Sequence, residues 1–147
     1  VMRIEKGHAA GNELNGTTTA LNLGTGRMVS KAKDSIGSKL SERPGLNEAN
    51  ALMQVGIRPR DAGDKITAGG HLMLHGGPVD AAHDQGYVTS AAYSPTLGSM
   101  IGLAFLKNGS ARLGERMRLV SPLPDLTVEV EVVSAHFVDP EGERVRA

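Results

Sequence analysis

The chain of 147 residues is long enough for one domain, or for one domain and part of a second, with a buried core. Its 16 basic residues balance its 16 acidic ones, and it has only two Phe and two Tyr, so nucleic acid and anionic membranes are unfavoured as partners. The absence of Cys excludes disulfide bonds and thiolate metal sites.

The sequence also gives expectations about location. Residues 1–13 carry charges early and have no apolar core, which is not typical of a signal peptide. No apolar run reaches the ~18 residues of a membrane span. We therefore expect a cytoplasmic protein.

Residues 1 to about 50 predict short, irregular elements. Thr17–Thr19 are candidate caps of a short helical turn that ends at Gly24, and residues 27–30 are a short strand candidate. Asp34 is the predicted N-cap of a helix over 35–43, which a proline–glycine pair then ends. The residues after this pair have the composition of a linker.

From about residue 51 the apolar pattern changes to a period of two, which predicts β-strands. Six strands are expected, at 51–58, 71–75, 86–94, 99–107, 115–122 and 126–135. The last is the clearest, because Val128, Val130 and Val132 alternate with Glu129 and Glu131, as in a sheet with one buried face. Short connections between the strands favour an antiparallel barrel or a Greek-key sandwich.

The turn between the third and fourth strands, Ser-Pro-Thr-Leu-Gly at 94–98, is polar within an apolar stretch. It could belong to an active site or close a hairpin. Pro95 favours the second interpretation because its ring presets φ for a turn, and Ser94 can bond to the backbone beyond it.

The histidines of the chain do not predict a metal site. On a strand, His71 and His75 would share a face but lie about 13 Å apart, too far to bind one ion. His83, Asp80 and Asp84 are near in sequence, yet the spacing matches no established metal pattern.

Two further motifs are only weak indications of a nucleotide-binding or hydrolase function. Residues 24–30, Gly-Thr-Gly-Arg-Met-Val-Ser, lack the preceding strand and the third glycine of a dinucleotide-binding loop. Ser90, Ser94 and His136 could supply hydrolase chemistry, but the chain has no nucleophile elbow.

Charged residues near the two ends of the chain are also candidates. Arg3 and Glu5 share a face if their segment is extended and diverge if it is helical; either could bind a ligand, although such pairs are usually solvated. Residues 139–144, Asp-Pro-Glu-Gly-Glu-Arg, form either a solvated loop or a docking segment for a partner chain.

Six segments, taken in order, carry a resemblance to a known family. They are RIEKG at 3–7, DSIG at 34–37, VGIRP at 55–59, GYVTSAAYSPTLGSMIGLAFLK at 86–107, GERMRL at 114–119 and HFVDPEGERVRA at 136–147. Together they resemble the aminomethyltransferase family, that of the glycine-cleavage T-protein. Within it, residues 15–24 and 136–144 are more similar to the alpha subunits of heterotetrameric sarcosine oxidases than to the T-protein.

The resemblance implies a mainly β fold with a short α/β N-terminal part. Its main element would be an antiparallel six-stranded Greek-key β-barrel of the aminomethyltransferase C-terminal type. Residues 1–48 would be the tail end of a folate-binding domain, and residues 49–147 the C-terminal barrel domain.

The resemblance also implies a function. The chain would be a C-terminal fragment of a sarcosine oxidase alpha-type subunit, in the region that passes the one-carbon unit from oxidised sarcosine to tetrahydrofolate. It would not be catalytic alone, because the family holds the pteridine largely with residues that precede the Arg-x-Glu-x-Gly motif. Tetrahydrofolate is the implied cofactor, while FAD, FMN and NAD would bind elsewhere in the complete oxidase. The implied partners are the beta, gamma and delta subunits and the rest of the alpha chain.

Three residues are candidates for the edge of the folate site: Arg3, Glu5 and Tyr93. The Arg3 charge suits the anionic tail of a folate, and the Tyr93 ring could stack on a ligand or hydrogen-bond to it. No catalytic residue and no metal ligand is predicted. Two other interpretations stay open: a non-catalytic β-barrel for subunit assembly, and the C-terminal part of a glycine-cleavage T-protein.

Overall fold

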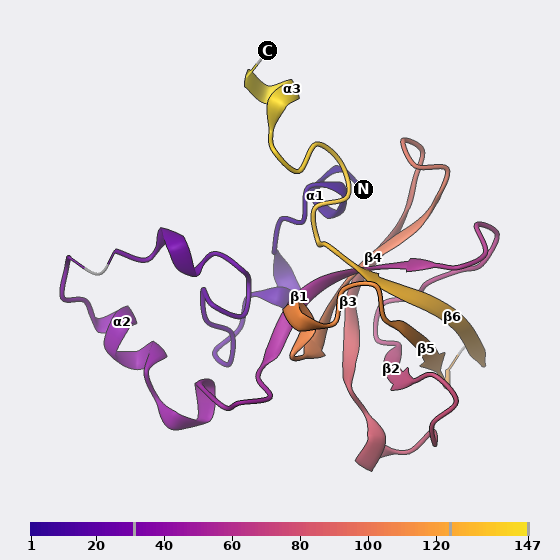
Figure 1. Cartoon of the computed structure of the whole chain (residues 1–147), viewed down its shortest axis with the longest axis horizontal. Helices are drawn as coiled ribbons and strands as arrows, with labels where there is room; N and C mark the ends of the chain where they lie inside the picture. The colour runs from indigo at the N-terminus through magenta and orange to yellow at the C-terminus, as the bar shows by residue number, and fades with distance from the viewer. Residues whose placement is uncertain (31, 124, 147) are drawn as a thin grey trace.

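Six antiparallel strands close into one barrel in the computed structural model, which describes residues 1–30, 32–123 and 125–146 (Figure 1). The strands are β1 Leu52–Pro59, β2 His71–Leu74, β3 Gly86–Ser94, β4 Ser99–Lys107, β5 Arg116–Ser121 and β6 Leu126–Val133. Their order around the barrel is β1-β4-β3-β2-β5-β6, a Greek-key arrangement in which β1 returns beside β4. The six predicted strands and the barrel fold are confirmed.

The barrel interior is filled by inward-facing apolar side chains. The fully buried ones include Ile57, Leu72, Val88, Leu106, Met117, Leu119, Val130 and Val132. On β6 the alternation is as predicted: the valines are buried, Glu129 is exposed and Glu131 is half-buried. Burial of this face supplies the main driving force for closure of the sheet.

Strand β4 departs from alternation, because residues 101–106 are all buried. For Ile101 and Leu103 the cause is a short helix, α1 (Met2–Glu5), on the outer surface of the barrel, whereas Phe105 packs against the ring of Tyr87. Ile4 of α1 packs against Ile101 and Leu103, and Phe137 closes the same small cluster. Both faces of β4 are therefore shielded from water, as its continuous apolar run requires.

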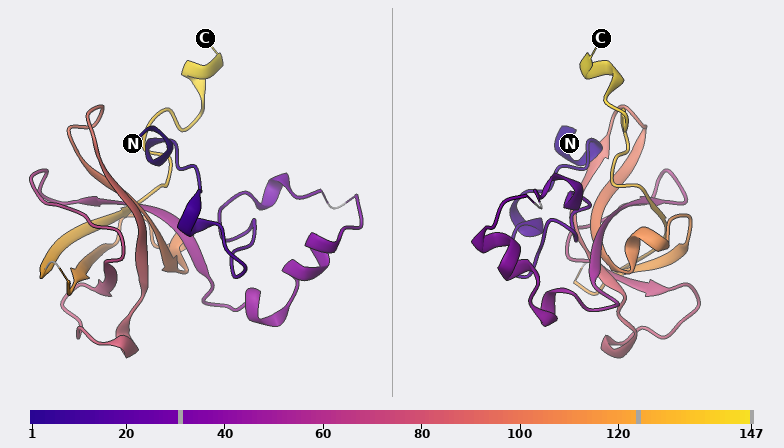
Figure 2. Two further views of the ribbon diagram at one scale, coloured as in Figure 1. Left: turned by 180° about the vertical axis from the view of Figure 1, so that it is seen from behind. Right: turned by 60° about the vertical axis from the view of Figure 1, so that its left-hand side comes forward.

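The remaining elements are short. They are η1 Gly11–Glu13, η2 Gly26–Met28, α2 Ile36–Ser41, η3 Pro44–Leu46, η4 Ala81–His83, η5 Gly109–Ala111 and α3 Glu143–Arg146. The described residues between 14 and 48, here called the lobe, project from one side of the barrel in all three ribbon views (Figures 1 and 2). No helix in the described parts of the chain combines the length and apolar character needed to cross a bilayer.

The lobe differs from its prediction at two points. Residues 27–30 form no strand; η2 occupies the segment, because no described strand lies beside it to pair with. Asp34 is not the N-cap of α2. Ser35 takes that position with an extended backbone, and its Oγ accepts a hydrogen bond from the N–H of Ser38 at 3.2 Å.

Two predicted turns are present. In the lobe, the N–H of Leu23 donates to the carbonyl of Thr19 at 3.3 Å, and Gly24 ends the turn with φ +71°. In the β3–β4 hairpin, Ser94 Oγ accepts from the N–H of Leu97 at 3.2 Å, and Gly98 adopts φ +66°. The polar turn at 94–98 therefore closes a hairpin, as expected.

Gly56, on β1, marks a close backbone approach at the barrel wall. A Cβ at this position would lie 2.4 Å from the carbonyl oxygen of Ser134 and 2.6 Å from Cζ of Phe137. Such overpacking forces the backbone or the ring to move. Glycine at position 56 thus allows residues 134–137 to cross directly over β1.

We predict that Gly56→Ala lowers the free energy of unfolding by about 3 kcal/mol because of this clash. Gly63→Ala is the matched control: Gly63 has no atom within 4 Å of the added Cβ, and its stability change should stay below about 0.5 kcal/mol. Urea unfolding followed by circular dichroism measures both. Equal effects of the two substitutions would contradict the close approach.

Candidate functional site

Residues 1–13 meet strand β3 through a polar cluster in which Glu13 and Ser90 are buried and Arg3 is exposed. Arg3 Nη2 donates to Ser90 Oγ at 2.6 Å, and Arg3 Nη1 lies 3.5 Å from Glu13 Oε2. Ser90 Oγ in turn donates to Glu13 Oε1 at 2.6 Å. The Arg3–Glu13–Ser90 cluster therefore joins α1, η1 and the barrel wall by charge-assisted hydrogen bonds.

Glu13 is the centre of this cluster, and no part of it is exposed to solvent. The 3-10 turn η1 positions it, because the N–H of Ala10 donates to Glu13 Oε2 at 3.0 Å. This is one half of a capping box; Ala10 has no side-chain oxygen to supply the other half. Both carboxylate oxygens are thus engaged, as a buried charge requires.

The protonation of Glu13 follows from these contacts. Burial raises the pKa of the carboxyl group, but the Ser90 and Thr89 hydroxyls, the N–H of Ala10 and the Arg3 charge favour the ionised form. Their combined effect holds the pKa below its ordinary value. Glu13 is therefore a carboxylate in the folded chain at neutral pH.

Glu5 is directed to a different part of the barrel from Arg3, as expected for two residues two apart on a helix. Only 8% of Glu5 is exposed, and its Oε1 accepts a hydrogen bond from Ser94 Oγ at 2.6 Å. Its backbone carbonyl accepts from the N–H groups of Phe137 and Val138 at 2.9 and 3.0 Å. Glu5 thus links α1 to the hairpin turn and to the segment after β6.

Tyr93 lies outside both groups of contacts. It is on β3, opposite Met100 in the register with β4, and 55% of it is exposed. No hydrogen bond of its hydroxyl is found among the described residues. The structure therefore brings Arg3 and Glu5 into two neighbouring anchors and leaves Tyr93 on the surface.

The segment after β6 folds back onto the N-terminal residues. Lys6 Nζ donates to the carbonyl oxygen of Asp139 at 2.7 Å and lies 3.4 Å from its Oδ2. The ring of His136 is 2.9 Å from the carbonyl oxygen of Lys6 through Nδ1. Asp139 also accepts from the N–H of Glu143 at 2.8 Å, at the start of α3. The first residue of the acidic turn at 139–144 is therefore bonded to the N-terminal part of the same chain.

The other motifs are dispersed. Three histidines each pair with a different carboxylate, and among the described residues no three His, Asp or Glu side chains converge on one point. The pairs are His71–Asp84, His83–Asp80 and His75–Glu129, at 2.7, 2.7 and 3.3 Å. The serines considered for hydrolysis bond to carboxylates: Ser90 to Glu13 and Ser94 to Glu5.

Comparison with known proteins identifies the class. Residues 53–139 match the glycine cleavage T-protein C-terminal barrel domain, so the chain belongs to this family. The crystal structure of the glycine cleavage system aminomethyltransferase T from Bartonella henselae has the same fold, with a TM-score of 0.67 and 22% identity. The matched region covers 94% of this chain and 37% of the Bartonella henselae chain.

Individual relatives refine the comparison. The chain is 40% identical over 146 residues to sarcosine oxidase subunit alpha of Rhizobium meliloti, and 33% identical over 147 residues to that of Corynebacterium sp. strain P-1. These matches cover 99% and 98% of the chain but 15% of each relative. The aminomethyltransferase of Halothermothrix orenii is 30% identical over 139 residues, which are 93% of this chain and 36% of that protein. The family resemblance found in the sequence is confirmed.

The lowered pKa of Glu13 predicts an acid-dependent loss of stability. Because the folded carboxyl releases its proton at lower pH than the unfolded one, its contribution is full above the ordinary pKa of 4.5 and is lost as the pH falls through the folded value. Glu13→Gln should cost about 1–3 kcal/mol at neutral pH and should weaken the acid dependence of the melting temperature.

Glu42→Gln is the control for this experiment, because Glu42 is exposed in the lobe. Thermal unfolding across the acid range compares both variants with the wild type. If Glu13→Gln keeps the full acid dependence of the wild type, Glu13 is not the group responsible.

Proposed function

We propose that the chain serves the folate-dependent step of a sarcosine oxidase alpha-type subunit, the transfer of the one-carbon unit from oxidised sarcosine to tetrahydrofolate. The observation that carries the proposal is the 40% identity with a sarcosine oxidase alpha subunit across 99% of the chain. Since the chain spans 15% of that relative, the activity would belong to the whole protein and not to these residues alone.

Residues 1–48 are proposed as the end of the folate-binding domain and residues 49–147 as the barrel that supports it. Bound tetrahydrofolate would supply the amine nitrogens that accept the one-carbon unit. FAD, FMN and NAD would bind elsewhere in the complete oxidase, together with the beta, gamma and delta subunits and the rest of the alpha chain. A cytoplasmic location belongs to the same proposal.

The fit of Arg3 to a folate tail rests on its exposure. Its guanidinium group is held by Ser90 and Glu13, yet 40% of the side chain is accessible. A charged group that is already fixed loses little conformational entropy when it binds a ligand carboxylate. We propose that Arg3 faces the anionic end of the folate and that Glu13 and Ser90 position it.

Glu5 and Tyr93 would have different roles. Glu5 is nearly buried and is bonded to Ser94, which supports a positioning role for α1 instead of direct contact. Tyr93 is exposed on β3, which leaves its ring free to stack on a ligand or to contact another chain.

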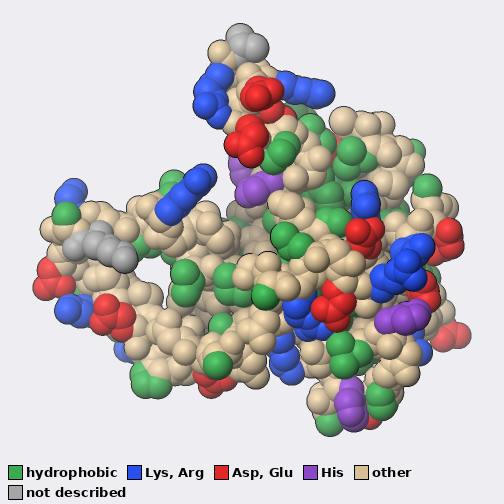
Figure 3. Space-filling view, in the orientation of Figure 1, with side chains coloured by type: hydrophobic (Ala, Val, Ile, Leu, Met, Phe, Trp, Pro, Cys, Tyr) green, Lys and Arg blue, Asp and Glu red, His purple; other side chains and the backbone are tan. Residues whose placement is uncertain are grey.

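A second candidate is a β-barrel that only assembles subunits. It is favoured by large apolar side chains exposed on the lobe, among them Leu21 at 60%, Met28 at 78% and Ile36 at 80%. Hydrophobic atoms are visible on the surface of the lobe in Figure 3. Exposed apolar surface of this kind marks contacts with other chains.

The C-terminal part of a glycine-cleavage T-protein is the third candidate, at the lower identity of 30%. Folate binding by the complete protein separates the first and second candidates.

We predict that Arg3→Ala weakens tetrahydrofolate binding by the complete oxidase about tenfold, the effect of losing one charge-assisted hydrogen bond. Equilibrium binding to the purified complex measures the change, and its melting temperature shows whether the variant is folded. Arg27→Ala, which removes an exposed lobe arginine, is the control and should bind normally. Unchanged affinity in a folded Arg3→Ala complex would rule out the proposed contact.

A further inference from the structure

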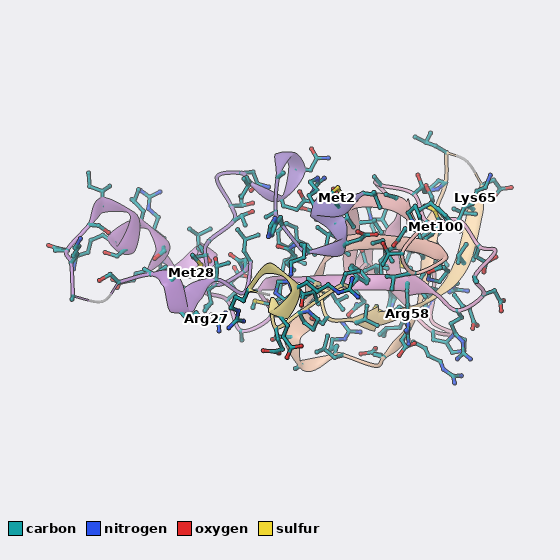
Figure 4. All side chains as sticks on the ribbon, turned by 90° about the horizontal axis from the view of Figure 1, so that it is seen from above. Met2, Arg27, Met28, Arg58, Lys65 and Met100 are labelled. Atoms are coloured by element: carbon teal, nitrogen blue, oxygen red, sulfur yellow. The ribbon has the colours of Figure 1, made fainter. Side chains whose placement is uncertain are left out.

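An open groove of about 490 Å³ lies on the barrel surface at the end of β1. Three arginines line it, Arg58, Arg60 and Arg116, together with one carboxylate, Glu131. The β3–β4 hairpin contributes Leu97 and Ser99. Arg58 lies over the barrel in Figure 4, remote from Arg27 and Met28 of the lobe. No residue of α1 lines the groove, so it is separate from the α1 contacts described above.

Strand register explains why these charges meet. Glu131 on β6 is paired with Arg58 on β1 and with Arg116 on β5, so the three residues form a row across adjacent strands. All three alternate with buried neighbours and are directed away from the core. Arg60 extends the row just beyond the end of β1, where its N–H donates to the carbonyl of Glu129 at 3.0 Å.

The single carboxylate of the row is already engaged. Glu131 Oε2 accepts hydrogen bonds from Arg58 Nε at 3.2 Å and from Arg58 Nη2 at 3.0 Å. Arg60 and Arg116 have no carboxylate oxygen within 4.0 Å among the described residues. The described residues that line the groove therefore carry an excess of two positive charges.

Other acidic residues near the groove lie outside its lining or are paired with another side chain. Asp61 and Asp64 follow Arg60 in the chain but do not line the groove. Glu129 is paired with His75 at 3.3 Å. In a chain whose total charge is zero, the excess is a local feature that raises the concentration of anions at this surface.

We propose that this groove binds a small polyvalent oxyanion, either a di- or tricarboxylate or a phosphate ester. Guanidinium groups match carboxylate and phosphate oxygens with two parallel N–H donors. The Ser99 hydroxyl is an additional donor, and the Leu97 side chain provides an apolar wall for a carbon skeleton. The proposal does not rest on the folate role.

The test is isothermal titration of the 147-residue chain with citrate and, separately, with inorganic phosphate, at constant ionic strength. We expect saturable binding of at least one anion, weakened about tenfold by Arg60→Gln or by Arg116→Gln. Glu131→Gln removes the competing carboxylate and frees Arg58, so it should tighten binding several-fold. Arg27→Gln, an exposed arginine of the lobe, should change nothing.

Two results would overturn the proposal. One is the absence of saturable binding of either anion. The other is a loss of binding in Arg27→Gln that equals the loss in Arg116→Gln, because it would indicate general charge screening. A preference for citrate identifies a polycarboxylate ligand, and a preference for phosphate identifies a phosphate ester. The melting temperatures of the arginine variants show whether a loss of binding is caused by unfolding.

Discussion

The burial of one carboxylate constrains how the N-terminal residues meet the barrel. Glu13 is inaccessible to water, and an ionised group in that position is stable only if its oxygens are bonded. Ser90, Ala10 and Arg3 supply these bonds, and each comes from a different element or turn. Fixing Glu13 therefore also fixes α1, η1 and the outer face of β3 relative to one another. The covering of β4 by Ile4 depends on the same arrangement.

The segment after β6 lies beside α1 (Figure 1). The segment after β6 crosses over Gly56 and then bonds to Glu5 and Lys6. Gly7 permits the contact: it has φ +71°, and a Cβ there would lie 2.6 Å from the carbonyl oxygen of Ala135. A candidate ligand-facing residue, Arg3, is thus held by the barrel and by residues far away in the sequence.

The sequence predicted the barrel well and the lobe only in part: the helix near 35–43 is present as α2, but the strand at 27–30 and the Asp34 cap are not. Strands such as β6 bury one face, so apolar and polar residues alternate along them and the strand can be recognised in the sequence. The lobe buries little apolar surface, so local hydrogen bonds determine its structure. One of them makes Ser35 the N-cap of α2, where the sequence had predicted Asp34. The division of the chain near residue 48 stays a prediction, although residues 1–13 pack on the barrel.

The site was predicted only in part. Arg3 and Glu5 were singled out from a motif, but their partners Ser90 and Ser94 were not, because hydrogen bonds between residues 87 and 89 positions apart leave no local pattern. Glu13 had one weak signal, its place three residues after Ala10, where a capping-box glutamate stands. Without a Ser or Thr at position 10 this pattern is not recognisable in the sequence alone.

Hydrogen exchange of residues 1–13 tests most directly whether the buried Glu13 cluster holds these residues on the barrel. The amide of Glu5 donates within α1 and that of His8 donates to the carbonyl of Arg3 at 2.8 Å, so both report on this segment. If the cluster is the anchor, these amides should be protected nearly as well as those of β3, and Glu13→Ala should remove that protection while β3 keeps its own. Rapid exchange in the wild type, at the rate of the α2 amides in the lobe, would contradict the anchoring role of Glu13.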